Sequence, residues 1–392
     1  MNKRSVWITL CPLLLLASAC SSPPATTSLP PAGAQAAPPA HARTGSAQYL
    51  YIYNTGSPGE YHGQYARYSV PGLKLMQTTE ADGVGSPEAF GSDGSPYFVD
   101  EGIPSGFALY LQPFGKNAVP AKQQFYGIPC QSTSLAFGPT GNSYAVQYCS
   151  QSVLEFAPGK KTGKPKKPIA TYTGGNLTGT VYPTYAAVDP NGNLYVGDTG
   201  GGVTYFAAGG TQGVVALATS TGSVNQMIVD SHGDVWSIHG PNPTKVYFQS
   251  ETLCILDPSG SVVRNEVAER FSNGTLAQRY YTAPTDSSVY AADGLSIAVD
   301  SSGRAYTGNQ DTSDDGVLID YNPSSSCPNE NLSFVLPTRA FPQVAVDNEG
   351  GYYLTDYNDN TISSYKAAST KRRKQITQET GVISITYAAM SP

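Results

Sequence analysis

The chain has little charge, few histidines and almost no run of helix-forming residues. Only 13% of its 392 residues are charged and 4 are histidine, and runs rich in Glu, Lys and Leu are scarce. This composition argues against a helical fold. The net charge of −6 gives no general reason to expect a nucleic acid as partner. The sequence contains no Gly-x-Ser-x-Gly nucleophile elbow and no phosphate-cradling glycine loop.

Glycine, proline and tyrosine are abundant instead, with 41, 30 and 27 residues. Short aromatic and β-branched runs, broken by Gly, Pro and Asn, occur throughout the chain. Such runs favour strands, and the residues that interrupt them favour turns. We therefore expect an all-β protein.

The N-terminus has the three parts of an export signal. Lys3 and Arg4 supply the positive start, residues 6–16 form an apolar stretch, and residues 17–19 are the small residues of a cleavage region. The apolar stretch is shorter than the roughly 20 residues that span a bilayer. The pattern therefore predicts a cleaved signal rather than a membrane-spanning helix.

The residue after this signal is a cysteine. Residues 16–20, Leu-Ala-Ser-Ala-Cys, resemble the lipobox of bacterial lipoproteins, although Ala17 stands where that family usually has Leu. The resemblance implies that Cys20 is acylated and becomes the new N-terminus. An ordinary secretory signal that is cut nearby is the alternative.

Residues 21–47 are rich in Pro, Ala, Ser and Thr and show no periodic apolar pattern. Such a segment buries no core and behaves as a semi-extended tether. We therefore divide the chain into a signal peptide (1–19), an acylated cysteine with a disordered linker (20–47) and a folded domain (48–392). The expected location is extracytoplasmic, on a bacterial membrane to which the lipid anchors the protein.

One pattern occurs six times: an apolar run, a turn of the form Asp/Gly-x-x-Gly, and a second run of aromatic or apolar residues. The six copies are 88–100, 135–147, 186–198, 227–239, 297–309 and 344–356. Each turn glycine can take positive φ, so each copy predicts a β-hairpin. A third and a fourth run accompany the hairpins, as in 202–208 and 167–172. Four antiparallel strands per repeat are typical of a propeller blade.

The turn glycines are separated by 47, 51, 41, 70 and 47 residues, which is blade-sized spacing with one insertion. Residues 48–54 look like a second strand with no first strand before it, and 381–388 like a first strand with nothing after it. Pairing these two closes the ring and removes both exposed sheet edges. We predict a β-propeller of seven four-stranded blades, closed by the N- and C-terminal strands. Six blades is the alternative, if the first copy is irregular.

The repeat, apolar-x-apolar-Asp-x-x-Gly-x-apolar-Tyr-apolar-x-Asp, resembles that of the NHL-like and the gluconolactonase- and streptogramin-lyase-like propellers. The resemblance covers nearly the whole mature chain. It implies the propeller fold. It does not imply an activity, because these propellers host binding proteins, scaffolds and several enzymes.

Four cysteines lie in the folded domain, namely Cys130, Cys149, Cys254 and Cys327. An even number in an exported chain favours disulfides, and no Cys-x-x-Cys pair indicates a metal site. Folding the hairpin about Gly141 puts Cys130 nearly opposite Cys149, at a distance that a disulfide can bridge. Cys254 and Cys327 are paired by elimination. Buried free thiols are the alternative.

Polar residues stand at the strand ends that we expect around the mouth of the central channel. The candidate ligand or metal residues are Glu88, Asp100, Asp198, His239, Asn309, Asp311 and Asp356. Tyr148 ends another second strand. A ring of carboxylates and amides can hold a hard cation such as Ca²⁺. The alternative is structural, because short polar side chains at such positions satisfy turn amides.

The resemblance adds an expectation about this mouth. In the gluconolactonase-like propellers a Glu, an Asn and an Asp around the channel hold a divalent metal, which implies Glu88, Asn309 and Asp356 as the nearest counterparts. They do not match that family's motif one by one. The streptogramin-lyase-like propellers use a His pair with a Glu. Only His239 and His62 are placed to reach the mouth here, and they form no clearly matched pair.

The gap of 70 residues contains an insertion, roughly residues 268–294, that carries Tyr280, Tyr281 and Tyr290. We expect it to connect a fourth strand to the next first strand at the mouth. There its tyrosines can form a lid or a sugar-stacking platform. The alternative is a loop whose aromatic residues pack onto the blade below.

Two basic runs, 160–167 and 371–374, are expected in loops between third and fourth strands, on the face away from the mouth. Near a lipid anchor they can touch anionic headgroups or wall polymers. A solvated loop is the alternative.

Two functions follow as hypotheses. The first is an anchored propeller that acts as a scaffold or binds a partner, an unidentified protein or a carbohydrate. The second is a metal-dependent, lactonase-like hydrolase, which needs at least three oxygen ligands converging within about 2.6 Å of one point. We favour the first, because only one His is well placed and no motif matches closely. A divalent cation such as Ca²⁺ is the one cofactor considered, no catalytic residue is assigned, and a monomer is expected.

Overall fold

The computed structural model describes most of the folded domain. The described residues are 48–55, 62–82, 87–90, 96–100, 107–111, 124–126, 132–158, 167–218, 223–239, 266–281, 293–310, 316–321, 332–338, 343–356, 360–377 and 384–390. All of them belong to one compact unit, Pro38–Pro392. Within these ranges the regular structure is all β, and no helix there has the length and apolarity to cross a membrane.

Five of the sheets have four strands each. The first in the chain contains β28 (Ser384–Met390), β1 (Tyr49–Thr55), β2 (His62–Ser69) and β3 (Lys74–Asp82). The next contains β4 (Pro87–Phe90), β5 (Pro96–Asp100), β6 (Phe107–Leu111) and β7 (Gln124–Tyr126). The others are β16 (Val224–Val229), β17 (Val235–His239), β18 (Glu266–Ser272) and β19 (Thr275–Tyr281); β20 (Asp293–Val299), β21 (Ala305–Gln310), β22 (Gly316–Tyr321) and β23 (Leu332–Thr338); and β24 (Gln343–Val346), β25 (Tyr352–Asp356), β26 (Thr361–Tyr365) and β27 (Arg372–Thr377).

The sixth sheet has eight strands and consists of two successive antiparallel runs of four. The first run is β8 (Ser132–Phe137), β9 (Ser143–Gln147), β10 (Ser152–Phe156) and β11 (Ala170–Gly174). The second is β12 (Pro183–Val188), β13 (Leu194–Asp198), β14 (Val203–Phe206) and β15 (Gln212–Leu217). The outermost strands β11 and β15 join the runs by a short parallel pairing at Thr173–Gln212 and Gly174–Gly213. We call each run of four strands a blade.

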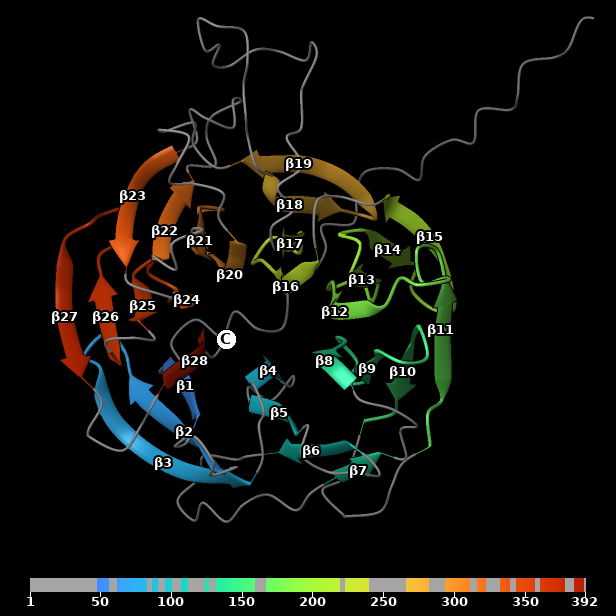
Figure 1. The fold of residues 1–392 in the computed structure, drawn as a ribbon, viewed down its shortest axis with the longest axis horizontal. Helices are drawn as coiled ribbons and strands as arrows, with labels where there is room; N and C mark the ends of the chain where they lie inside the picture. The colour runs from blue at the N-terminus through green and yellow to red at the C-terminus, as the bar shows by residue number, and fades with distance from the viewer. Residues whose placement is uncertain are drawn as a thin grey trace, which may run out of the picture. The chain divides into compact units, whose positions relative to one another are not determined.

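The blades form a closed ring (Figure 1). Each first strand contacts the first strand of the next blade, and a contact between β28 and β4 completes the circle. The first strands in ring order are β4, β8, β12, β16, β20, β24 and β28. This arrangement confirms the predicted all-β propeller.

The two ends of the chain close the ring, as predicted. Strand β1 pairs with β28 in antiparallel register from Leu50–Met390 to Thr55–Ser384, with one irregularity after Tyr53. The blade thus takes its first strand from the C-terminus and its other three from the N-terminus. Its innermost strand and the neighbouring strand are therefore joined by hydrogen bonds between opposite ends of the chain.

The six predicted hairpins are present as β4–β5, β8–β9, β12–β13, β16–β17, β20–β21 and β24–β25. The turn glycine has positive φ in all five of these turns that the structure describes, from +77° at Gly350 to +85° at Gly192 and Gly233. A residue with a Cβ rarely adopts this conformation. The repeated glycine is therefore what allows the chain to reverse direction between the first and second strands.

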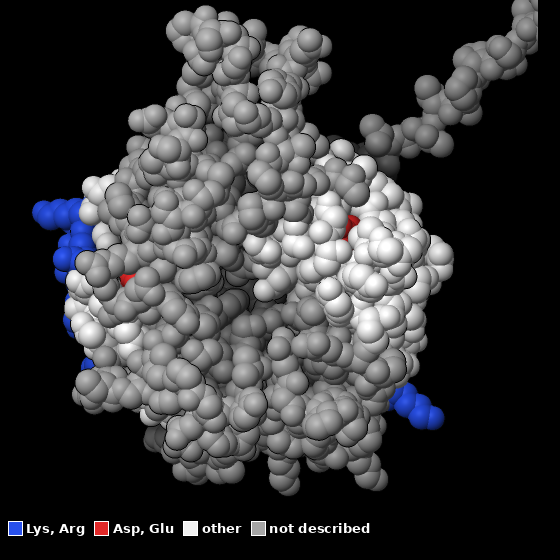
Figure 2. All heavy atoms as spheres, viewed as in Figure 1, with Lys and Arg blue, Asp and Glu red and all other residues white. Residues whose placement is uncertain are grey.

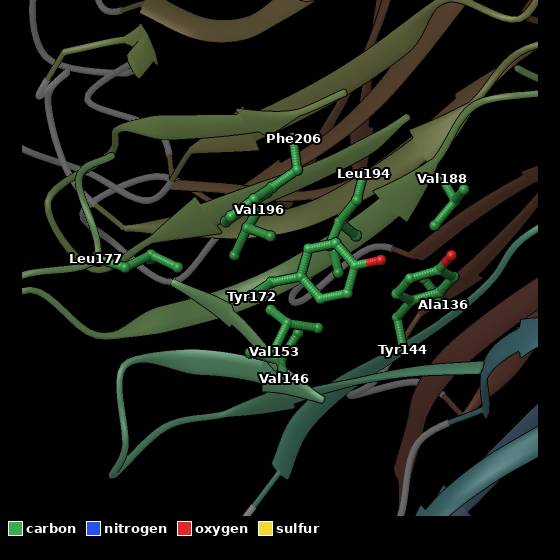
Figure 3. Packing of buried hydrophobic residues seen from close by; sticks show 11 residues of the cluster. Ala136, Tyr144, Val146, Val153, Tyr172, Leu177, Val188, Leu194, Val196 and Phe206 are labelled. Atoms are coloured by element: carbon green, nitrogen blue, oxygen red, sulfur yellow. The ribbon is translucent and has the colours of Figure 1, made fainter. Parts of the chain in front are cut away.

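Successive blades pack through aromatic and branched side chains between their sheets. Figure 3 shows this for blades β8–β11 and β12–β15, where Tyr172 lies against Phe206. Their ring centroids are 5.3 Å apart and the planes are nearly perpendicular, an edge-to-face contact. Burying a side chain as large as Phe206 contributes about 1.5–3 kcal/mol to stability. The core of the protein thus lies between blades rather than within a single sheet.

The antiparallel topology gives the ring two faces. One face, which we call the turn face, carries the turns between first and second strands and between third and fourth strands. The other, which we call the mouth face, carries the turns between second and third strands and the connections from blade to blade. The predicted ligand residues that lie in described strands belong to the mouth face.

Candidate functional site

Most of the predicted mouth residues stand at equivalent strand ends. Asp100, Asp198, His239 and Asp356 are the last residues of the second strands β5, β13, β17 and β25. Asn309 is the last residue but one of β21, and Glu88 is the second residue of β4. Their backbone positions therefore share the mouth face. Of the side chains in this set, the structure describes those of Asp198 and Asp356; Asp311 lies outside the described residues.

Asp198 is fully buried, with 0% of its surface exposed. Its Oδ1 accepts hydrogen bonds from the backbone N–H of Gly200 at 2.7 Å and of Gly202 at 3.0 Å. These bonds cap the turn between β13 and β14. Two backbone hydrogen bonds close the same turn, from the N–H of Asp198 to the carbonyl of Gly202 and from the N–H of Gly201 to the carbonyl of Asp198. This carboxylate therefore has a structural task in its own turn.

The same arrangement recurs on the turn face. Four aspartates there directly follow a first strand and accept two backbone hydrogen bonds on Oδ1, from the residues two and four positions later. They are Asp189, Asp230, Asp300 and Asp347. An aspartate that caps a turn is thus a general device of this chain. The geometry of Asp198 matches the structural alternative that the sequence left open.

Asp356 is partly exposed at the end of β25, where its backbone pairs with Thr361. Burial raises the pKa of Tyr365, and the negative charge of Asp356 adds a smaller effect in the same direction. Among the described residues, no group of three or more His, Cys, Asp and Glu side chains is arranged to hold a metal ion. Asp198 and Asp356 therefore belong to no such group within the part of the chain that the structure describes.

An aromatic pair spans two blades on this face. Tyr148 directly follows β9 and Tyr182 directly precedes β12, so they come from neighbouring blades. Their rings are stacked, with centroids 4.9 Å apart and an angle of 20° between the planes. Tyr148 keeps 38% of its surface exposed. The pair therefore presents an aromatic surface to the solvent.

Hydrogen bonds hold Tyr182 and the turn that follows Tyr148. The backbone of Tyr182 pairs with Thr199, since its N–H donates to the Thr199 hydroxyl at 3.1 Å and its carbonyl accepts from the Thr199 N–H at 2.9 Å. The side-chain amide of Gln151, in the turn after Tyr148, donates to the carbonyl of Gly179. The turns of the two blades are thus linked by a hydrogen bond as well as by the aromatic pair.

The same polar chain continues to a third blade, where the Ser223 hydroxyl donates to the carbonyl of Thr199 at 3.3 Å. We call this set of residues the mouth ledge. It consists of Tyr148, Gln151, Tyr182, Thr199 and Ser223. A rigid aromatic face beside hydroxyl and amide groups is suited to a ligand that has both an apolar face and polar edges.

The sequence indicated Tyr148, as a second-strand end, but missed Tyr182. Tyr182 stands in the connection before a first strand, where the repeat pattern has no fixed residue. Tyr182 stacks on Tyr148, which follows the second strand of the preceding blade. This contact depends on the order of the blades in the ring. The signal that was present is the aromatic residue placed immediately before Pro183 and the strand β12.

The prediction that residues 268–294 form an inserted loop is wrong for residues 268–281. Residues 266–281 form the third and fourth strands β18 and β19 of their blade, so Tyr280 and Tyr281 end an outermost strand rather than lie in a loop. Strand β19 pairs with β18 over its whole length, with two irregularities. The additional length of this blade therefore lies elsewhere, and Tyr290 is outside the described residues.

The cysteines are described only in part. Cys149 lies in the turn directly after β9, two residues beyond Gln147. Cys20, Cys130, Cys254 and Cys327 lie outside the described residues. Acylation of Cys20 and the two cysteine pairings therefore stay predictions.

Similarity to known proteins is found at the level of structure. No model of a known protein family matches the chain, and no curated protein sequence does. The chain is similar to two solved structures of proteins named as proposed 6-phosphogluconolactonases. The one from Bacteroides fragilis NCTC 9343 has a TM-score of 0.61 at 14% identity, over 89% of this chain and 99% of that chain. The one from Bacteroides uniformis ATCC 8492 has a TM-score of 0.60 at 14% identity, over 88% and 100%.

A protein from Lactobacillus plantarum is also similar, with a TM-score of 0.54 at 11% identity over 88% of this chain and 99% of that chain. Identity this low carries no information about substrate or partner. The likenesses do extend over almost the whole length of each neighbour. They show that the chain has the fold of a β-propeller.

Proposed function

We propose that this protein is an exported, lipid-anchored β-propeller that binds a carbohydrate ligand on the mouth ledge. The observation that carries the proposal is the exposed, stacked pair of Tyr148 and Tyr182. The C–H face of a sugar ring packs on an aromatic face, and its hydroxyls bond to polar groups at the edge. The mouth ledge supplies both kinds of group within one rigid surface.

Rigidity favours this use of the ledge. Binding costs less when the contact groups are already held in place, because fewer rotatable side chains become ordered. The tie between Gln151 and Gly179 and the paired bonds between Tyr182 and Thr199 provide this order before any ligand arrives. A loop that folded only on binding would lack it.

The proposed location rests on the N-terminal residues and on the cysteines. Residues 1–19 have the parts of an export signal, and Cys20 follows them. The folded domain has an even number of cysteines, and a hairpin about Gly141 would bring Cys130 nearly opposite Cys149, which supports a disulfide between them. A structural disulfide is typical of a chain that leaves the reducing cytoplasm. Changing Cys20→Ser should move the protein from the membrane fraction to the soluble fraction or leave it unprocessed.

The binding proposal is tested with defined sugars. Full-length protein purified from membranes is titrated calorimetrically with soluble peptidoglycan fragments and with neutral oligosaccharides. We expect at least one of these probes to bind and Tyr148→Ala to weaken the affinity at least about tenfold, since the stacking face is lost. Tyr148→Phe keeps that face and should bind within about twofold of the wild type.

An exposed residue away from the mouth provides the matched control. Val214→Ala shortens a solvent-exposed side chain on the outermost strand β15 and should leave sugar binding unchanged. Equal affinities of wild type and Tyr148→Ala, or no binding of any probe, would overturn the proposal. The metal-dependent hydrolase is the competing function, and it is separated from binding by the metal measurement that ends the Discussion.

A further inference from the structure

Basic side chains gather on one outermost strand and the turn before it. Lys366, Lys371, Arg372, Arg373 and Lys374 are all exposed, at the end of β26, in the following turn and along β27. Figure 2 shows Lys and Arg side chains gathered at the rim where Figure 1 places β27. The whole chain has a net charge of −6, so this concentration of positive charge is local.

The hydrogen bonds of two of these side chains leave their charge available. The Arg372 guanidinium donates to the side-chain carbonyl of Gln375 at 2.7 Å, and the Lys374 ammonium to the backbone carbonyl of Gly72 at 2.7 Å. Both acceptors are neutral. Hydrogen bonds of this kind orient a cation without cancelling its charge.

Apolar side chains lie beside the basic strand. Leu75 and Met76, at the start of β3, are 50% and 48% exposed. The bond from Lys374 to Gly72 ties β27 to the turn that leads into β3, and Ile376 of β27 packs on the same hydrophobic cluster as Leu73. The exposed pair therefore adjoins the basic strand.

The surface also lies where the chain enters the propeller. The side chain of Gln48 accepts a hydrogen bond from the N–H of Asn348 at 2.8 Å, in the turn between β24 and β25. That turn is on the turn face, together with the β2–β3 and β26–β27 turns. A segment that connects residue 48 to a lipid therefore begins on the face that carries the basic residues.

We propose that this surface docks on an anionic lipid bilayer. We call it the basic rim; it consists of Lys74, Leu75, Met76, Lys366, Lys371, Arg372, Arg373 and Lys374. Each basic side chain within a Debye length of anionic headgroups is attracted to them, and exposed Leu and Met side chains enter the boundary between headgroups and acyl chains. Docking through the turn face directs the mouth ledge away from the membrane. The proposal deepens the anchored-propeller function and rests on it for the orientation.

Protection of a sheet edge is the competing explanation for charge on an outermost strand. The chain does not apply it generally. Strand β15 is also outermost, contains no Lys or Arg, and exposes Val214 and Val215 by 59% and 51%. Beyond its short pairing with β11, strand β15 therefore has no charged side chain to protect its edge. The charge on β27 calls for an additional reason.

The test is vesicle flotation of the full chain carrying Cys20→Ser, so that no acyl chain contributes. We expect binding to vesicles that contain phosphatidylglycerol, weaker binding to pure phosphatidylcholine vesicles, and a loss of binding as salt rises. Replacing Arg372, Arg373 and Lys374 together by Gln should weaken binding to the anionic vesicles on the order of 100-fold. Gln375→Lys adds a charge to the same strand and should strengthen it about fivefold.

Matched variants separate the apolar contribution. Leu75→Gln with Met76→Gln should weaken binding several-fold, whereas Val214→Gln with Val215→Gln, an equally exposed pair on β15, should not. Equal binding to both vesicle types overturns the proposal, as does a Gln375→Lys variant that binds no better than its parent. If the triple Gln variant aggregates without vesicles, the Gln375→Lys comparison decides. Sugar binding at the mouth ledge is measured separately, so its failure is distinguishable from failure of the basic rim.

Discussion

At the scale of single residues, the propeller depends on aspartates that accept hydrogen bonds from the backbone of the turn in which they stand. An aspartate directly after a first strand satisfies two backbone N–H groups that the tight turn would otherwise leave without an acceptor. In two of the turns the other carboxylate oxygen accepts a bond from a buried aromatic side chain, Trp236 to Asp230 and Tyr353 to Asp347. The repeat residue Asp therefore joins a turn to the core between blades.

Removal of Asp347 should be costly. Asp347→Ala takes the acceptor from the N–H groups of Glu349 and Gly351 and from the buried Tyr353 hydroxyl. We expect a loss of about 3 kcal/mol in the free energy of unfolding, because buried donors are left unsatisfied. Urea unfolding measures it. Glu349→Ala, in the same turn but exposed, should change stability by less than about 0.5 kcal/mol; equal losses in the two variants would contradict the assignment.

Two glycines with the same backbone conformation provide a second test. Gly209 and Gly274 both have φ of +76° and both lie in a turn between third and fourth strands. A Cβ on Gly274 would lie 2.8–2.9 Å from the ring of Tyr205, which is held by a hydrogen bond from its hydroxyl to Asn193. A Cβ on Gly209 meets nothing within 4 Å.

Both Gly→Ala variants therefore have the same backbone strain, but only Gly274→Ala adds a clash, with the ring of Tyr205. We expect Gly274→Ala to be less stable than Gly209→Ala by about 1–3 kcal/mol in thermal or urea unfolding. Variants of equal stability would show that the turn moves away from Tyr205 at no cost.

Among single residues, the sequence predicted those that belong to the repeat and missed Tyr182, which stands at a position where the repeat has no fixed residue. The turn glycines and the carboxylates that satisfy turn amides follow from local chemistry. Tyr182 does not, because its stacking partner Tyr148 comes from another blade and is 34 positions earlier in the sequence. A contact across two repeats needs the three-dimensional order of the ring.

At the scale of elements, the inner strands were predicted well and the outer strands poorly. The six hairpins have alternating or continuous apolar runs, because their side chains are buried between blades. Strand β27 is exposed along almost its whole length, so its residues Arg372–Thr377 carry no apolar alternation and were predicted to lie partly in a loop. Strand β19 was missed for the same reason: it too is an outermost strand.

The closing strand allows a direct test of the ring. A chain that ends before residue 384 lacks β28 and leaves the inner edge of β1 without a partner. We expect this variant to lose cooperative unfolding and to aggregate through the open edge, as followed by circular dichroism and gel filtration. Removal of residues 391–392 alone keeps β28 and should have no effect. A soluble, cooperatively folded variant without β28 would contradict closure by the terminal strands.

At the scale of the whole molecule, buried tyrosines couple stability to alkaline pH. Burial raises the pKa of seven described tyrosines. For Tyr144 the pKa rises from 10.0 to about 12, because of burial first and then the negative charge of Glu155. Tyr144 donates a hydrogen bond to that carboxylate at 3.2 Å.

The sign of the pH effect follows from proton release. Above pH 10 the unfolded chain loses phenol protons that the folded chain keeps, so unfolding is favoured as the pH rises. Stability should be fully present below pH 10 and should fall through the window from 10 to about 12. The urea midpoint, measured across this window, tests it. The fall should be shallower in Tyr144→Phe; a midpoint that does not change up to pH 12 would contradict the burial of these phenols.

The closed ring was predictable from the sequence because the repeat spacing and the two incomplete ends required it. The site was less predictable, since residues at strand ends on the same face can have different roles, such as binding a ligand or capping a turn. Asp198 stands where a ligand carboxylate was expected, and it caps a turn. A position at the mouth face therefore does not by itself identify a ligand residue.

The measurement that tests this account most directly is metal analysis of the purified full-length protein, combined with thermal melting with and without a chelator. A mouth face that binds through aromatic and hydrogen-bonding groups predicts less than one divalent ion per chain and a Tm that the chelator does not change. One tightly held Ca²⁺ or other divalent ion per chain, whose removal lowers the Tm, would contradict it. That result would make the carboxylates of the mouth face a metal centre and the hydrolase the better description of this protein.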